Sequence, residues 1–170
     1  APVMSHNLFK EWIKPEIFDT PTLLVVIDNL RYDQWFAFEE TVNSFYKKTK
    51  EESYISILPT ATQYARNAIF SGLMPSAMEK KYPDWWKNDT EEGGKNLYEH
   101  KFLGEQLKSL GLNLNWEYHK ISSLKQGKSL SQNFKSQKDN DLTVIVYNFV
   151  DMLSHSKTEM EVIKELASND

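Results

Sequence analysis

Two runs of consecutive apolar residues stand out along the chain, at 22–27 (TLLVVI) and 142–147 (LTVIVY). Runs of this length and composition are typical of strands that are buried on both faces, as in a parallel sheet. The apolar and β-branched segment 54–58 predicts another strand, which Pro59 ends, and 113–119 predicts a fourth. The apolar pattern therefore indicates several short strands, separated by long connecting stretches.

Apolar residues at helical spacing fill most of these connections. They predict helices over residues 32–47, 62–70, 96–110 and 121–134, with a further helix over 158–167. Gly111 is expected to end the third of these helices, and Gly72 and Pro75 the second. In the first helix the residues expected to be buried are Trp35, Phe36, Phe38, Val42, Phe45 and Tyr46. Strands that alternate with helices predict an α/β fold, with a mostly parallel sheet sandwiched between helices.

The remaining segments suggest how the chain is divided. Residues 1–20 are interpreted as an N-terminal linker, with a short amphipathic helix before Pro15, and residues 21–170 as the domain. In segment 74–94 the apolar residues have no regular spacing, so this segment is expected to be an irregular flap near a site. Segment 135–141 is expected to be a polar loop. The sequence lacks an initiator Met and ends within a helical pattern, so the domain is expected to be truncated.

Composition narrows the classes of function. The net charge of −4 argues against a large basic field for duplex nucleic acid. There is no cysteine, so a transition metal would need Asp, His or hydroxyl ligands. No apolar run is long enough to cross a membrane and no signal peptide is visible, which favours the cytoplasm.

Polar residues follow three of the predicted strands. They are Asp28 with Arg31 and Asp33, Thr60 with Thr62, and Asp151 with His155. Parallel strands bring their carboxyl ends to one edge of a sheet, where α/β proteins bind ligands. Carboxylate, hydroxyl and imidazole groups suit zinc or manganese, and two such metals can stabilise both oxygens of a phosphoryl transfer.

Each of these groups also has an ordinary structural explanation. A Thr or an Asp after a strand often caps the next helix, and a lone His is more often structural than a ligand. The hydroxyl of Thr60 or Thr62 could serve as such a cap. Asp33 is expected to be structural, because a carboxylate favours the first turn of a helix.

A family resemblance covers the chain from about Pro21 onwards. Thr62–Pro75, preceded by Pro59, resembles the nucleophile segment of the alkaline phosphatase superfamily, particularly its nucleotide pyrophosphatase/phosphodiesterase branch. Asp28–Arg31 resembles the first metal-ligand turn of that branch, and Asp151–His155 its Asp-x-x-x-His pair. Within the superfamily, segments 26–34 and 146–155 are similar to the PglZ domain, including the form that serves as the output domain of a response regulator tied to type IX secretion.

The resemblance implies a role for each matching residue. Thr62 would be the nucleophile and a metal ligand, Asp28 would share its metal, Asp151 and His155 would hold a second metal, and Arg66 would approach a phosphate. The cofactor would be two zinc ions, with manganese as the alternative. The branch often has an Asn three residues after the nucleophile, but here that position is Ala65, so the phosphoryl group would be bound differently.

The ligand set is also incomplete by this comparison. The superfamily needs a further Asp-His pair and another His, and none of these follows His155 in this sequence. His6, His100 and His119 match no ligand position and are interpreted as surface or structural residues. The given chain alone is therefore expected to bind metal poorly and to be inactive.

The sequence thus predicts a metal-dependent phosphodiesterase that acts on nucleotide or oligonucleotide phosphodiesters. The aromatic pair Trp85 and Trp86 would either stack on bases or pack their loop onto the core. The response-regulator resemblance adds a dimer and secretion-system or signalling partners. The alternative is a non-catalytic signalling module that binds a nucleotide or a protein partner.

Overall fold

The computed structural model describes residues 2–18, 20–87, 96–133 and 139–148. The chain divides into two compact units, each of which is described here by itself. The helical unit comprises residues 1–20 and 52–114, and the sheet unit comprises residues 21–51 and 115–170. The predicted α/β class is confirmed, because helices are combined with a parallel sheet.

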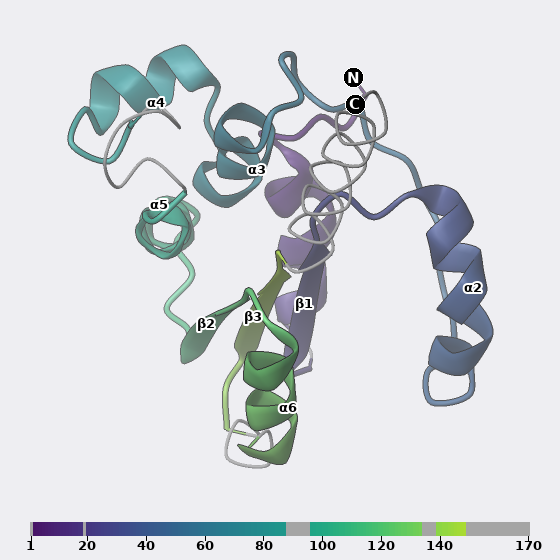
Figure 1. The fold of residues 1–170 in the computed structure, drawn as a ribbon. Coiled ribbons are helices and arrows are strands. Elements are labelled where there is room, and N and C mark those ends of the chain that lie inside the picture. The colour runs from purple at the N-terminus through teal and green to yellow at the C-terminus, as the bar shows by residue number, and fades with distance from the viewer. Residues whose placement is uncertain (1, 19, 88–95, 134–138, 149–170) are drawn as a thin grey trace, which may run out of the picture. The chain divides into compact units, whose positions relative to one another are not determined.

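The sheet contains the strands β1 (Thr22–Ile27), β2 (Trp116–Ile121) and β3 (Leu142–Tyr147). Their order is β1-β3-β2, and both neighbours run parallel to β3 (Figure 1). Thr22 and Trp116 both pair with Leu142, so the three strands begin in register and end together. The strands expected at 22–27 and 142–147 are confirmed at the predicted residues.

Burial differs between the two apolar strands. The central strand β3 is buried at every position from Leu142 to Val146, as its continuous apolar run predicts. In β1, by contrast, Leu23 and Val25 are 41% and 43% exposed. The expectation that 22–27 is buried on both faces is therefore wrong. In the described sheet β1 has a neighbour on one side only, and one of its faces is left partly open.

Two helices of the sheet unit are described, α2 (Tyr32–Asn43) and α6 (Leu124–Asn133). The helix expected over 32–47 ends early, and its predicted core residues are not buried: Phe36, Phe45 and Tyr46 are more than half exposed. The rings contact each other instead. Trp35 lies edge-on to Phe38 at 5.0 Å between centroids, and Tyr32 to Phe36 at 4.7 Å.

The helical unit contains η1 (Phe9–Ile13), α1 (Lys14–Ile17), α3 (Thr62–Ser71), α4 (Pro75–Lys81) and α5 (Glu99–Ser109). Its two longest helices, α3 and α5, pack on each other. Buried apolar side chains from these elements form its core: Phe9, Ile17, Ile69, Phe70, Met78, Phe102, Leu103 and Leu107. The helix expected over 96–110 and its end at Gly111, which has a φ of +69°, are confirmed with a later start.

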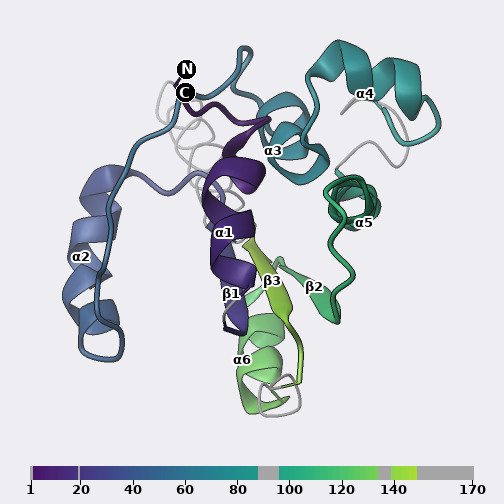
Figure 2. The same cartoon turned by 180° about the vertical axis from the view of Figure 1, so that it is seen from behind.

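Residues 9–17 form a continuous helical stretch, which can be followed in Figure 2, the view from the side opposite to Figure 1. Helix η1 runs directly into α1, and Pro15 lies in the first turn of α1. The short helix expected before Pro15 therefore continues past it. Phe9 and Ile17 are buried. A domain boundary at residue 20 stays a prediction.

Two predictions for the helical unit are wrong. Segment 54–58 is not a regular strand, because its ladder consists of a single bridge between Ile55 and Met4. Pro75 begins helix α4 rather than only ending the preceding one, so part of the expected irregular flap is helical, with Met78 fully buried. Proline suits that first helical position, because the N–H that it lacks would have no partner within the helix there. Residues 88–94 of the flap, most of the loop 135–141 and the helix 158–167 lie outside the described residues.

Candidate active site

Asp28 lies directly after β1, at the carboxyl edge of the sheet. Its N–H donates to the carbonyl of Tyr147 at 2.9 Å, which carries the pairing of β1 with β3 one residue beyond the strand. Asn29 then adopts a left-handed φ of 58° and turns the chain away from the sheet. The side chain of Asp28 is half-buried at this turn. Asp28 is therefore held on the rigid end of a strand rather than on a long loop.

Asn148 lies at the same edge. Its N–H donates to the carbonyl of Ile121 at 2.9 Å, so the ends of β3 and β2 are joined just as those of β1 and β3 are. Asn148 was not among the predicted site residues. Its position directly after a buried strand, like that of Asp28, was the signal that could have found it.

The turn after Asp28 is fixed by Arg31. The guanidinium donates from Nε to Asp33 Oδ1 at 2.9 Å and from Nη2 to Asp33 Oδ2 at 2.8 Å. The backbone N–H of Arg31 donates to Gln34 Oε1, which joins the turn to the first turn of α2. The hydrogen bond from Arg31 lowers the pKa of Asp33 below its ordinary value. These contacts support the prediction that Asp33 is structural.

A pocket of about 380 Å³ adjoins this turn. Its lining combines cationic and aromatic side chains with one leucine and one carboxylate: Leu30, Arg31, Tyr32, Trp35, Lys48, Lys50 and Glu51. Lys48 Nζ donates to Glu39 and Glu51, at 2.7 Å each, and these bonds raise the pKa of Lys48. Tyr32 Oη also donates to Glu51, which raises the pKa of the tyrosine.

Thr62 is the first residue of α3, as predicted for the candidate nucleophile. The N-cap is Ala61, and no side-chain cap hydrogen bond is formed there. The alternative in which Thr60 or Thr62 is the N-cap residue is therefore wrong. Thr62 is half-buried, and it lies where backbone N–H groups of the first turn and the helix dipole favour negative charge.

The next turn of α3 is fixed by buried polar contacts to α5 and to the segment before it. Arg66 forms an ion pair with Glu99, and both side chains are almost fully buried. Asn67 donates to Asn96 Oδ1 at 3.0 Å. The contact that the structure gives Arg66 is thus a structural one, and its approach to a phosphate stays a prediction.

The aromatic pair at 85–86 packs onto the helical unit. Trp85 stacks on Tyr82 at 4.7 Å and meets Phe102 edge-on at 5.7 Å, while Trp86 lies edge-on to Tyr64 at 5.6 Å. Of the two alternatives for these rings, packing is therefore the one that the structure shows.

The predicted metal ligands are only partly described. Asp151 and His155 lie outside the described residues, and Thr62 and Asp28 belong to different units, so their convergence in one pocket stays a prediction. Within the described ranges, no cluster of three Asp, Glu or His side chains could hold a metal ion. The carboxylate of Asp28 and the hydroxyl of Thr62 each suit zinc or manganese chemically, but two such groups alone would not complete a ligand shell.

A comparison with protein family models shows which family the chain belongs to. The family model for the BREX system PglZ alkaline phosphatase-like domain matches residues 8–170. The chain belongs to the PglZ family. All predicted site residues of this PglZ domain, Asp28, Thr62, Arg66, Asp151 and His155, fall inside the match.

The parallel sheet is consistent with the alkaline phosphatase-like α/β fold of the PglZ family. None of the curated proteins compared matches the chain in sequence. Among the helices that the structure describes, none combines the length and the apolar character needed to span a membrane.

Proposed function

We propose that this PglZ domain is a metal-dependent phosphoesterase that cleaves nucleotide or oligonucleotide phosphodiesters. The observation that carries the proposal is the position of Asp28, a candidate metal ligand, on the carboxyl edge of a parallel sheet in an alkaline phosphatase-like domain. That edge is where α/β proteins bind ligands. The substrate class and the metal dependence go beyond the family assignment.

Thr62 is the proposed nucleophile. Its Oγ forms a bond to phosphorus as the bond from phosphorus to the leaving oxygen breaks, and the hydroxyl proton passes by way of solvent to that oxygen; water then attacks phosphorus, breaks its bond to Oγ and returns a proton to Thr62. Zinc or manganese held by Asp28, Thr62, Asp151 and His155 would stabilise the negative charge on the attacking and leaving oxygens. The first turn of α3 would add its free N–H groups and its dipole.

The pocket beside Asp28 supports a nucleotide as part of the substrate. Its lining residues Leu30 and Arg31 follow the candidate metal ligand Asp28 by two and three positions in the sequence. The pocket combines Arg31 and Lys50 with the rings of Tyr32 and Trp35. Cations and aromatic faces together are typical of sites for single-stranded nucleic acid, where rings stack on bases and cations meet phosphates. This placement favours a nucleotide diester over a simple phosphate monoester.

The proposed setting is the cytoplasm, as the output domain of a response regulator of the PorX type that controls type IX secretion. In this setting the domain would function in a dimer, with signalling or secretion-system partners. Because the given chain supplies only part of the expected ligand set, catalysis is proposed for the longer protein and not for these residues alone.

A non-catalytic module that binds a nucleotide or a protein partner is the second candidate. Two observations favour it: Ala65 stands where the related branch often has an Asn, and Arg66 is paired with Glu99 inside the helical unit. Both reduce the number of side chains that could stabilise a transition state. Binding without turnover would be the signature of this function.

A phosphodiester assay on the full-length protein separates the two candidates. We expect hydrolysis of bis-p-nitrophenyl phosphate that requires added Zn²⁺ or Mn²⁺ and is lost with a chelator. Thr62→Ala should abolish turnover, while Thr60→Ala, which removes a nearby hydroxyl outside α3, should retain it. Nucleotide binding without metal-dependent turnover would favour the signalling module, and full activity of Thr62→Ala would exclude Thr62 as the nucleophile.

A further inference from the structure

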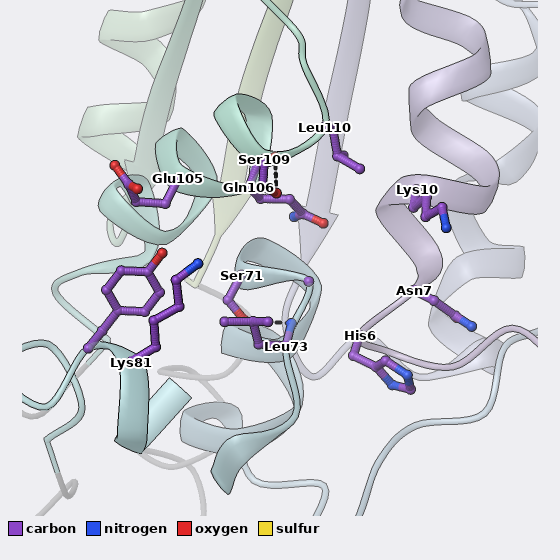
Figure 3. A pocket seen from close by; sticks show the side chains of 12 residues that line it. His6, Asn7, Lys10, Ser71, Leu73, Lys81, Glu105, Gln106, Ser109 and Leu110 are labelled. Atoms are coloured by element: carbon purple, nitrogen blue, oxygen red, sulfur yellow. Dashed lines mark hydrogen bonds between the residues drawn. The ribbon is translucent and has the colours of Figure 1, made fainter. Parts of the chain in front are cut away.

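A second pocket lies wholly within the helical unit, at the opposite end of α3 from Thr62. Its volume is about 220 Å³, and Figure 3 shows the side chains around it. The wall comes from the N-terminal segment, the end of α3, the end of α4 and the end of α5: His6, Asn7, Lys10, Ser71, Gly72, Leu73, Lys81, Tyr82, Glu105, Gln106, Ser109 and Leu110. A helix of ten residues is about 15 Å long, so this pocket is separate from the candidate active site.

Gly72 and Gln106 build the floor of the pocket. Gly72 ends α3 with a left-handed φ of 68°, and a Cβ at this position would lie 2.5 Å from Gln106 Oε1. The Gln106 amide is held in place because its Nε2 donates to the carbonyls of Ile69 and Phe70, at 3.0 and 2.8 Å. The glycine therefore lets a buried glutamine lie against the end of α3.

The helix ends around the pocket already have hydrogen-bond partners. Gln106 satisfies two carbonyls at the end of α3, and Lys14 Nζ donates to the carbonyl of Leu110 after α5 at 3.4 Å. Lysines near helix ends usually serve such carbonyls and the negative end of the helix dipole. Lys10 and Lys81 are therefore not needed for these particular carbonyls.

The charge of the lining is positive. Lys10 and Lys81 approach from different elements and lie on different sides of the pocket in Figure 3. Among the described lining residues Glu105 is the only carboxylate, and Lys108 Nζ binds it at 2.7 Å. Lys81 is also 5.1 Å from the ring centroid of Tyr82, so a cation and an aromatic ring occupy the same wall.

The pocket also offers neutral polar groups beside the two cations. The amide of Asn7 is held by its own backbone turn, since Met4 N–H donates to Asn7 Oδ1 at 2.7 Å, and Asn7 is one of the residues that line the pocket. The Nδ1 atom of His6 is buried and has no hydrogen-bond partner among the described residues. The rings and chains of Tyr82, Leu73 and Leu110 supply apolar surface.

We infer that this pocket is a binding site for a small dianion with an apolar group, such as an aromatic phosphate monoester. The dianion would lie between Lys10 and Lys81, while the apolar group would pack on Tyr82, Leu73 and Leu110. Two cations from different elements suit a doubly charged group better than a carboxylate, because each cation gains its own charge-assisted hydrogen bond. The site is independent of the proposed phosphodiesterase function.

The test uses phenylphosphonate, a dianion that the candidate active site cannot hydrolyse. Titration into the ¹⁵N-labelled 170-residue chain should shift the amide resonances of Gly72, Leu73, Ser109 and Leu110 in a saturable way. Benzyl alcohol, which is neutral and of similar size, should give little shift. Shifts confined to residues around Thr62 or to the pocket lined by Arg31 would overturn the proposal.

Alanine variants of single lysines test whether Lys10 and Lys81 bind the dianion. Lys81→Ala and Lys10→Ala should each raise the dissociation constant about tenfold, equal to about 1.4 kcal/mol. Lys80→Ala, an exposed neighbour on α4 that does not line the pocket, removes the same charge and should leave the constant within about twofold. Equal effects of the Lys80 and Lys81 changes would show a diffuse charge effect and would overturn the site.

A filling variant tests the cavity itself. Ser109 is exposed and lines the pocket, so Ser109→Trp can occupy the space while both lysines remain. It should abolish the saturable shifts, and the unchanged amide spectrum of α3 and α5 would show that the unit is still folded. Binding that survives both Ser109→Trp and the two lysine changes would place the ligand elsewhere.

Discussion

Helices α3 and α2 both follow a polar turn that carries candidate site residues, but they are held in different ways. Helix α3 is buried along most of its length, including Arg66 and Asn67, whose partners Glu99 and Asn96 lie in or just before α5. Helix α2 buries none of its side chains in the described structure. Its ion pair between Arg31 and Asp33 is more than 60% exposed on both sides.

The comparison shows that helical spacing alone does not tell how a helix is stabilised. A buried helix can carry charged residues if each finds its partner, because unpaired buried charge is costly. An aromatic-rich helix can remain exposed if nothing described packs against it. The same comparison suggests roles: α3 presents Thr62 from a buried helix, while α2 offers exposed rings and is flanked by the cations Arg31, Lys48 and Lys50.

The largest expected difference is in aromatic packing, between the helical unit that contains α3 and the exposed helix α2. Phe102→Ala should lower the free energy of unfolding of the helical unit by about 3–5 kcal/mol, because it removes a buried ring that also contacts Tyr82 and Trp85. Phe36→Ala on α2, where the ring is 58% exposed, should cost less than about 1 kcal/mol. Amide hydrogen exchange of α5 and of the sheet gives the two free energies separately; similar losses would show that α2 is packed after all.

Breaking the buried ion pair should have an effect of similar or slightly smaller size. Glu99→Ala leaves the guanidinium of Arg66 buried without its partner, and we expect a loss of about 3–5 kcal/mol in the protection of α3 amides. The matched control is Glu105→Ala, which removes the same charge from an exposed pair on the same helix and should cost about 0–1 kcal/mol. If the two changes cost the same, the Arg66–Glu99 pair is not what joins α3 to α5.

Glycine substitutions separate backbone strain from packing. Gly72 and Gly111 have nearly the same left-handed φ, 68° and 69°, but only Gly72 has a neighbour, Gln106, where a Cβ would be placed. Gly111→Ala should cost about 1–2 kcal/mol for the left-handed conformation alone. Gly72→Ala should cost about 1 kcal/mol more, because Gln106 must move and lose bonds to the end of α3. Urea denaturation measures the loss of unfolding free energy for each substitution. An equal loss at both positions would show that Gln106 can move without losing stabilising hydrogen bonds.

The smallest effect concerns the exposed contacts of α2. Because Arg31 lowers the pKa of Asp33, Arg31→Ala should raise that pKa towards its ordinary value near 3.8. The sign follows from the lowered pKa: the pair stabilises the turn above the pKa of the unfolded chain, and this contribution is lost as the pH falls through the folded pKa. Carboxyl ¹³C NMR titration measures the pKa of Asp33, with Lys48→Ala as a control that should leave this pKa unchanged. No shift in Arg31→Ala would contradict the pairing.

The sequence by itself determined the parallel strands at 22–27 and 142–147 and the helix ends at Gly72 and Gly111. These depend on local signals: continuous apolar runs, and glycines that can adopt a positive φ without steric cost. The position of Asp28 at the end of a strand follows from the same signals, whereas Thr62 on the first turn of α3 was predicted from the resemblance to the alkaline phosphatase superfamily; the family match covers both residues.

Only the tertiary structure decided which elements cover one another. The pairing of Arg66 with Glu99, the exposure of Phe36 and the pocket at the end of α3 all join segments far apart in sequence or depend on what lies beside a helix. Periodicity identifies an apolar face but not its partner, because burial depends on packing against residues that a local pattern does not contain. The ion pair, for example, joins side chains 33 positions apart, beyond the reach of any helical repeat.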